Sequence, residues 1–330
     1  MSIAEPSIDQ TGSSVADALV SSRGSRVDLT FRALALAAGI TVLVVLALIT
    51  ISTTHSAWPA FSHHGIHYFF STDWRPNSGH FGILGFAFGT AVISFIGVLL
   101  AVPISIGIAL FATEVAPQKL RSVITTVMDL LASVPSVVFG LVGFYVLKKP
   151  LQSLFRSIGD GVKDIPVLHQ LFGQNSAGIS LLTAGIVLAI MITPIITSVS
   201  REVFDTVPRN DKEGALALGA TRSEMINGVV IPHSLGGLTG AVMLGLGRAM
   251  GETIAVTLLI GGVTPRISAN LLGPSDSMPS AIARNLGESS GDFRAALIGL
   301  GVTLFVITML VNVGSRKAVS MLDLRLKGGA

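Results

Sequence analysis

The chain has 330 residues, of which 50% are hydrophobic and 12% are Asp, Glu, Lys or Arg, about half the charged fraction of an average soluble domain. Lys and Arg number 22 and Asp and Glu 19, so the net charge is only +3. The charges are bunched between long uncharged stretches, which excludes a soluble globular enzyme and an intrinsically disordered chain and predicts an all-α polytopic membrane protein. The absence of cysteine excludes disulfides, iron–sulfur clusters and thiolate zinc sites.

The first 30 residues are expected to be a Ser-rich cytoplasmic tail. Glu5, Asp9 and Asp17 precede the first apolar stretch, and no short apolar region follows a basic start as it does in a secretory signal. The expected division of the chain is a tail at 1–30, a first transmembrane helix and outer loop at 31–80, a permease core with five transmembrane helices at 81–320, and a cytoplasmic tail at 321–330.

Counting outward from the charged residues predicts six transmembrane helices. They are expected at about 31–52, 82–112, 122–147, 177–200, 234–262 and 294–315, since a membrane helix needs about 20 predominantly apolar residues. An even number of spans places both termini on the same side of the membrane. With the tail inside, the inner segments carry 13 Lys and Arg residues and the outer loops 8, which favours an N-in, C-in topology.

The polar segment 201–232, between the fourth and fifth predicted spans, is the most informative part of the sequence. Nine of its first 24 residues are charged, so the segment is expected to lie in water. Pro208 suits the start of a short helix, and Gly219 suits its end. An ordinary amphipathic loop is the alternative interpretation.

The spacing in this segment resembles the EAA loop of bacterial ABC importer permeases, in which Glu-Ala-Ala precedes a Gly and then Ile-x-x-Pro. Gly214 and Val229 depart from that pattern conservatively. The resemblance implies a type I ABC importer permease (MetI-like) fold whose short helix docks on a separate ATPase subunit. By this resemblance the ATPase-coupling residues are Arg209, Asp211, Glu213, Gly214, Ala215, Leu218, Gly219 and Pro232.

The chain is not expected to be an enzyme. It contains no Gly-Lys dipeptide and therefore no P-loop for ATP, so ATP hydrolysis is expected in another polypeptide. An intramembrane protease or lipid hydrolase is disfavoured because neither H-E-x-x-H nor G-x-G-D occurs.

Arg248 lies deep in the fifth predicted span, 16 residues after Pro232 and 14 before Gly262. An arginine near the bilayer midplane is costly unless it faces a polar cavity or a partner. Glu252 follows four residues later, and an α-helix would place the two side chains on the same face as an ion pair. Two interpretations remain open: a structural ion pair between helices, or an anion site in which the guanidinium grips phosphate in bidentate fashion.

The run GRAMGETIAVT after the EAA loop, together with LLASVPSVVFGLVG in the third span, resembles the PstC family of permease subunits of the bacterial high-affinity phosphate importer. The resemblance covers about residues 80–320. It implies that Arg248 and Glu252 match charged positions important for phosphate passage, and the expected substrate path also includes Thr253 and Asp129. Permeases for sulfate, molybdate or phosphonate, and the sister PstA-type subunit, are the alternatives.

The same resemblance implies the partners and the location. They are a PstA-like sister permease, two PstB-like ATPase subunits, an external PstS-like phosphate-binding protein, phosphate as substrate, and the lipid of the cytoplasmic (inner) membrane. No cofactor or metal is expected. Nucleic acid is not expected as a partner either, because the small positive excess fits residues that flank membrane helices.

Two weaker signals have two interpretations each. Asp129 comes ten residues after Lys119; it is expected either at the inner interface of a tilted helix or on the translocation path beside a basic group. Five of the seven histidines lie in the first outer loop, where His63-His64-x-x-His67 could bind a metal. The aromatic residues around them instead favour a segment at the membrane interface; these are Trp58, Tyr68, Phe69, Phe70 and Trp74.

Overall fold

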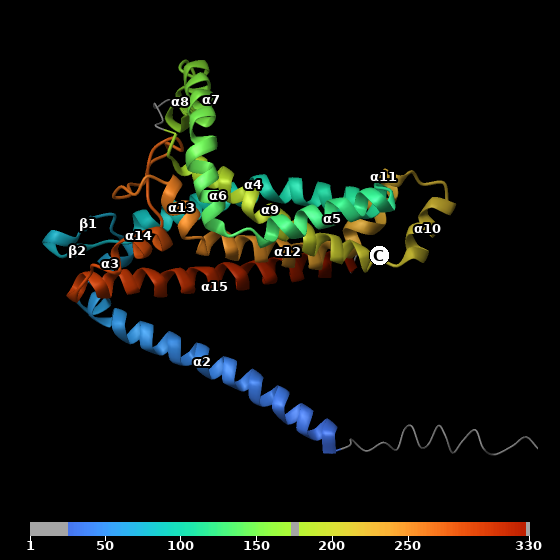
Figure 1. The fold of residues 1–330 in the computed structure, drawn as a ribbon, viewed down its shortest axis with the longest axis horizontal. Helices are drawn as coiled ribbons and strands as arrows, with labels where there is room; N and C mark the ends of the chain where they lie inside the picture. The colour runs from blue at the N-terminus through green and yellow to red at the C-terminus, as the bar shows by residue number, and fades with distance from the viewer. Residues whose placement is uncertain (1–25, 173–177, 328–330) are drawn as a thin grey trace, which may run out of the picture. The chain divides into compact units, whose positions relative to one another are not determined.

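The computed structural model describes residues 26–172 and 178–327 and is almost entirely helical (Figure 1). The elements up to the middle of the chain are α2 (Arg26–His64), α3 (His67–Phe70), β1 (Trp74–Arg75), η1 (Pro76–Ser78), β2 (His80–Phe81), α4 (Leu84–Leu110), η2 (Phe111–Val115), α5 (Gln118–Ser133), α6 (Ser136–Val142), η3 (Gly143–Leu147), α7 (Lys148–Gly161) and α8 (Pro166–Phe172). The remaining elements are α9 (Leu181–Asp205), α10 (Arg209–Ala217), α11 (Arg222–Met225), η4 (Ile226–Val230), α12 (Ile231–Gly251), α13 (Ile254–Leu259), α14 (Met278–Asn285) and α15 (Gly291–Lys327).

Six helical segments within the described residues are long and apolar enough to cross a membrane, which confirms the predicted number. They are Leu29–His64, Leu84–Val115, Ser136–Gly161, Leu181–Asp205, Arg222–Gly251 and Gly291–Lys317. The sidedness of the termini stays a prediction. Most of the tail expected at 1–30 lies outside the described residues, and α15 continues to Lys327, into the segment expected as the second tail.

The structure divides into two units, and the first ends at Thr53. Its described part is the stretch of α2 up to Thr53, in which every side chain from Leu29 onward is exposed. Thr41 and Thr50 donate their hydroxyls to backbone oxygens one turn earlier, each at 2.8 Å, so neither leaves an unpaired hydroxyl on an apolar surface. A helix that is apolar all round needs lipid or another apolar surface around it.

The second unit runs from Thr54 onward, and α9 lies at its centre. Close helix contacts depend on glycine: a Cβ at Gly185 of α9 would lie 2.6 Å from Ile96 of α4. Further along α9, a Cβ at Gly237 or Gly245 of α12 would lie 2.5 or 2.6 Å from Val203 or Ile196, respectively. Small residues at these positions let the helix backbones approach closely, which drives helix association in lipid.

The third span differs from its prediction, because no continuous helix covers 122–147. Helix α5 ends at Ser133, Val134 is extended (φ −65°, ψ 127°), and α6 begins at Ser136. The physical reason is Pro135, whose ring pushes the preceding residue out of the α region. The predicted stretch therefore consists of two helices joined by a break, and the segment that is long and apolar enough to cross a membrane starts only after it, at Ser136.

The fifth span also differs from its prediction. The helix begins with α11 at Arg222 instead of 234 and stops at Gly251, and Glu252 is extended (φ −68°, ψ 126°) before α13 starts at Ile254. The helices that follow the two breaks, α6 and α13, are in contact: a Cβ at Gly140 of α6 would lie 2.9 Å from the Cα of Ala255 in α13. Both breaks therefore lie at about the same level of the bundle.

Strands β1 and β2 lie at one end of the bundle, which we call the loop end (Figure 1). This end holds an aromatic core. Tyr68 is fully buried and donates its hydroxyl to the Ala296 carbonyl oxygen at 2.7 Å. Trp74 is also buried, so these two aromatics pack in the protein interior, and the position of the segment at the membrane interface stays a prediction. Trp58 and Phe70 are exposed, as an interfacial position requires.

Candidate functional site: the coupling helix and the polar seam

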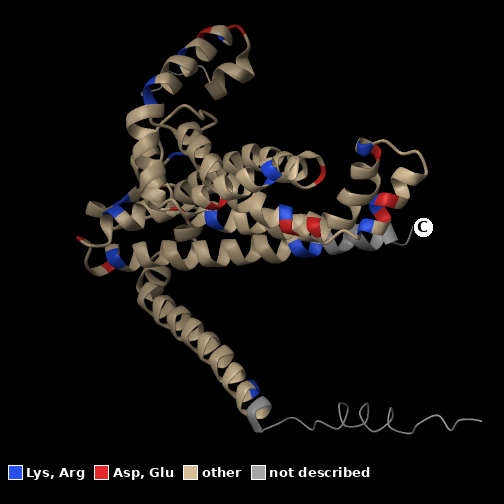
Figure 2. Cartoon of the chain, turned by 45° about the vertical axis from the view of Figure 1, so that its right-hand side comes forward, with Lys and Arg blue, Asp and Glu red and all other residues tan. Residues whose placement is uncertain are grey.

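Helix α10 lies at the end of the bundle opposite to the loop end (Figure 1), and we call this the coupling end. Lys, Arg, Asp and Glu gather around α10 and the neighbouring helix ends (Figure 2). The structure confirms that α10 follows Pro208, which is its N-cap residue. The charged segment is shorter than predicted, because Arg201–Asp205 belongs to α9 and residues from Arg222 onward belong to the fifth span.

Gly219 ends α10 as predicted. Its φ is +87°, a conformation that costs a residue with a Cβ about 1–2 kcal/mol. The Gly219 N–H donates to Leu216 and the Ala220 N–H to Ala215, at 3.0 and 3.2 Å. This pair of hydrogen bonds is a Schellman motif, which fixes the direction in which the chain leaves α10.

Most of the predicted coupling residues form an exposed surface. Arg209, Asp211, Glu213 and Gly214 are exposed on α10, and Leu218 is 91% exposed. Ala215 is partly buried against the bundle, and Pro232 lies in the first turn of α12. An exposed leucine beside charged residues on a short helix is a surface suited to a partner protein, and the coupling roles of these residues stay predictions.

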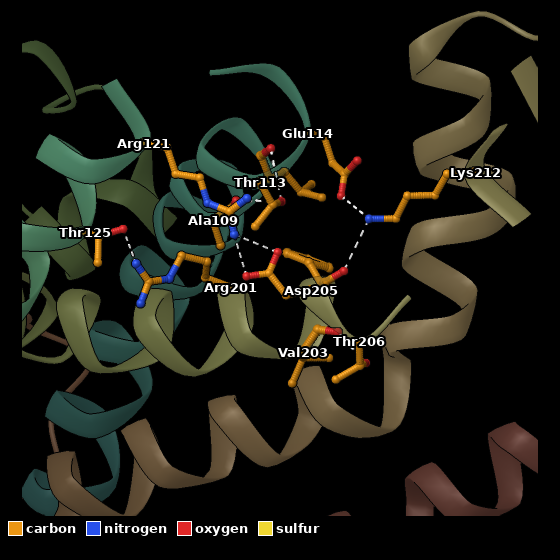
Figure 3. Close-up of polar contacts among 12 residues, drawn as sticks. Ala109, Thr113, Glu114, Arg121, Thr125, Arg201, Val203, Asp205, Thr206 and Lys212 are labelled. Atoms are coloured by element: carbon orange, nitrogen blue, oxygen red, sulfur yellow. Dashed lines mark hydrogen bonds and ion pairs between the residues drawn. The ribbon is translucent and has the colours of Figure 1, made fainter. Parts of the chain in front are cut away.

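Lys212 attaches α10 to the bundle, a role that sequence reasoning missed. Its Nζ lies 2.6 Å from Oε1 of Glu114 and donates to the Phe204 carbonyl oxygen at 3.3 Å (Figure 3). The side chains of Lys212 and Glu114 are only 17% and 7% exposed. Glu114 lies in η2, at the end of the second span, so one buried ion pair joins the coupling helix directly to a membrane helix.

A line of polar contacts, the α5–α9 seam, continues from this point along the bundle. Nη2 of Arg121 donates to both carboxylate oxygens of Asp205, at 2.8 and 2.6 Å. One turn further, Nη1 of Arg201 donates to the Thr125 hydroxyl (Figure 3).

The predicted path residue Asp129 is the next member of the seam. It accepts from the Ser198 hydroxyl at 3.4 Å. No Lys, Arg or His of the described residues lies within 4.0 Å of its carboxylate, so the structure does not place Asp129 in an ion pair with a basic group.

The Arg248–Glu252 ion pair expected on one helical face is wrong for this structure. Arg248 lies in the last turn of α12, whereas Glu252 lies beyond its end. Arg248 is exposed, and none of the described carboxylates lies within 4.0 Å of it. Glu252 is only 7% exposed and accepts from the Ala255 N–H at 3.2 Å, which satisfies one free donor at the start of α13. Thr253 is half-buried and donates to the Gly251 carbonyl oxygen at 3.1 Å.

A cavity of about 1270 Å³ opens at the loop end, which sequence reasoning did not predict. Residues 72–75 and 263–275 supply most of its lining, including the side chains of Asp73, Arg75 and Arg266. Arg75 donates to both oxygens of Asp73, at 2.6 and 2.7 Å, and its guanidinium holds the pKa of the Asp73 carboxyl below its ordinary value. Arg266 is exposed, so the cavity has a cation available at its surface.

The loop that forms one wall of this cavity is fixed by a buried charge. Asp276 is 2% exposed and pairs with Arg284 of α14. Burial raises the pKa of the Asp276 carboxyl, and the Arg284 guanidinium acts in the opposite direction.

His63, in the predicted histidine segment, contacts α15. Nδ1 of His63 lies 3.3 Å from Oδ2 of Asp292. Among the described residues, no group of three or more His, Cys, Asp or Glu side chains is arranged to hold a metal ion.

Comparison with known proteins agrees with this geometry. The family model described as "Binding-protein-dependent transport system inner membrane component" matches residues 101–327. The phosphate transport system permease protein PstC of Mesorhizobium japonicum is 41% identical over 324 residues, which are 95% of this chain and 99% of that protein. PstC of Xylella fastidiosa is 40% identical over 295 residues, 89% of this chain and 91% of that protein.

A solved structure confirms the permease fold predicted from the sequence. A chain in the crystal structure of a bacterial alginate ABC transporter, solved with an alginate pentasaccharide-bound periplasmic protein, matches with a TM-score of 0.56 and 17% identity. The match covers 90% of this chain and 96% of that chain. With a coupling-type helix, six apolar spans and these relatives, the chain belongs to the family of binding-protein-dependent transport system inner membrane components.

Proposed function

We propose that this chain is a permease subunit of an ATP-driven importer that carries inorganic phosphate across the cytoplasmic membrane. The observation that carries the proposal is Arg248, an exposed arginine without a carboxylate partner among the described residues, in a protein 41% identical to a phosphate permease. A guanidinium with free donors matches the geometry of a phosphate oxyanion. Glu252 is occupied with capping α13, so it does not neutralise this charge.

The coupling end is proposed to face the cytoplasm and the loop end the exterior, as in the predicted N-in, C-in topology. An ATPase subunit then docks on the exposed face of α10, and a phosphate-loaded binding protein docks over the cavity at the loop end. A homologous sister permease and a second ATPase subunit complete the importer. The Lys212–Glu114 ion pair supports this arrangement, because it joins the docking helix to the second span.

The proposed substrate is tested by reconstituting the complete complex in liposomes with the binding protein outside and ATP inside. Uptake of radiolabelled phosphate should depend on ATP and should persist in excess sulfate and molybdate. ATP-dependent uptake of sulfate or molybdate, without uptake of phosphate, would contradict the proposal and favour another oxyanion.

The docking role of α10 is tested by replacing Gly219 with Ala. The added Cβ meets no atom within 4 Å, so the only cost is the positive φ of +87°, about 1–2 kcal/mol. This cost opens the Schellman motif and redirects the exposed face of α10. We expect at least a fivefold loss of co-purifying ATPase at unchanged membrane abundance.

Gly228→Ala is the matched control. Gly228 lies in η4 near the same end of the bundle, its φ is not positive, and a Cβ there also meets no atom within 4 Å. The control should retain the ATPase fully. Equal ATPase recovery from both variants would show that the geometry at Gly219 does not matter for docking.

A further inference from the structure

Arg201 is the positively charged member of the α5–α9 seam that has no carboxylate partner among the described residues. Asp205, one turn away on the same helix, receives both of its short hydrogen bonds from Arg121. Arg201 contacts the Thr125 hydroxyl, and no described carboxylate lies within 4.0 Å of its guanidinium. A guanidinium has five N–H donors, so most of the donors of Arg201 remain available in a half-buried position.

Keeping the Arg201 guanidinium half-buried costs free energy unless a polar group or an anion contacts it. Arg201 lies in the helix of the fourth apolar span, four residues before the helix ends. Charged side chains in membrane spans face a water-filled path or a partner, and they mark ion pathways. Thr125 orients the guanidinium, and the Ser198 hydroxyl lies on the same face of α9, three residues away. The guanidinium and the Thr125 hydroxyl, whose own proton is free because it accepts from Arg201, are suitable donors for a tetrahedral oxyanion.

The level of Arg201 relative to Arg248 follows from the antiparallel packing of α9 and α12. Gly245 of α12 packs on Ile196 of α9, so Arg248 lies three residues beyond this contact, at about the level of Thr193. Arg201 is eight residues from Thr193, so it lies about 12 Å nearer the coupling end at 1.5 Å per residue.

We propose that Arg201 is a second anion-contact position, which receives the oxyanion between Arg248 and the coupling end. This inference rests on the proposed function, since it assigns another residue to the same transport path. The exposed Asp129 carboxylate lies one turn beyond Thr125 on α5. Its negative charge shortens the residence of the anion at Arg201, so that the position passes the anion on and does not trap it.

The absence of cysteine makes Arg201 accessible to a direct chemical test. Arg201→Cys introduces the only thiol in the chain, and its modification is measured as a mass shift of this subunit in the complete complex. Uptake should fall at least tenfold in this variant, and a positively charged thiosulfonate should restore part of it. A negatively charged thiosulfonate of similar size should not. Inorganic phosphate should slow the modification.

Two further variants serve as controls for the effect of Arg201→Cys on uptake. Arg201→Lys retains the charge and should retain most of the uptake, so a low abundance of the cysteine variant does not decide the test. Lys119→Gln removes an exposed positive charge near the start of α5, outside the seam, and should leave uptake unchanged.

If Arg201→Cys reacts with neither reagent while Lys119→Cys, at an exposed position outside the seam, reacts with both, the proposal is overturned. Equal rates with and without phosphate, or equal rescue by both reagents, would also overturn it. Failure of the proposed function gives a different result, because another oxyanion would then be transported and would protect the thiol in place of phosphate.

Discussion

Phosphate uptake is expected to fall by about two orders of magnitude when Arg248 is replaced by Gln, while the amount of chain in the membrane stays close to wild type. A hydrogen bond to a charged group contributes about 1.5–3 kcal/mol, and each 1.4 kcal/mol is a factor of about ten in rate. Arg248 is exposed and has no described carboxylate partner. Its removal therefore leaves no buried acid behind.

The effect is separated from folding by measuring uptake and membrane abundance in the same vesicles. Arg248→Lys keeps the charge but loses bidentate geometry, so it should fall between wild type and Arg248→Gln. Normal uptake by Arg248→Gln at wild-type abundance would exclude the proposed anion contact.

For Glu252 we expect an effect on membrane abundance, because its carboxylate caps α13 and does not pair with Arg248. Glu252→Gln keeps an oxygen that can accept from the Ala255 N–H, so abundance should hold, whereas Glu252→Ala removes the acceptor and should lower abundance. Equal abundance of the Gln and Ala variants would contradict the capping role.

Replacing Lys212 with Met is expected to separate ATP hydrolysis from transport. The change leaves the Glu114 carboxylate, which is 7% exposed, without its cation, and breaking a buried ion pair costs about 3–5 kcal/mol. Most of that cost is avoided if α10 moves away from the bundle, which disconnects the docking surface from the second span. The reconstituted complex should hydrolyse ATP but import phosphate at least tenfold more slowly.

The matched control is the double variant Glu114→Gln with Lys212→Met. It removes both charges, so no unpaired buried carboxylate remains, and uptake should recover substantially from the level of the single variant. If the fold-loss of phosphate uptake in the double variant equals the product of the losses in Lys212→Met and Glu114→Gln measured singly, the two residues act independently. A fully coupled Lys212→Met complex would show that α10 is attached by its other contacts.

The features that depend on local sequence could be predicted. The long uncharged stretches predicted six spans, because a chain in lipid must satisfy its own backbone hydrogen bonds and an apolar stretch of that length does so as a helix. Pro208 and Gly219 gave the start and end of α10, because one lacks an N–H and the other tolerates a positive φ. Both properties belong to the residue itself and do not depend on what packs nearby.

The features that depend on partners distant in the sequence could not be predicted. Glu114 and Lys212 are 98 residues apart, and Arg121 and Asp205 are 84 apart. A single sequence contains no signal that joins such pairs. The break after Gly251 was missed for a related reason. Mostly apolar residues lie on both sides of it, so the apolar run continues where the helix does not. The expected Arg248–Glu252 pair depended on a continuous helix.

The coincidence of the two breaks, after α5 and after α12, determines where the bundle is mechanically soft. Bending an intact membrane helix requires breaking hydrogen bonds that lipid cannot replace. At Val134–Pro135 and at Glu252–Thr253 those hydrogen bonds are already absent. Because α6 packs on α13 beside both breaks, the two helices can pivot together at one level. The helices that follow the breaks, α6 and α13, then form one packed unit close to the level of Arg248.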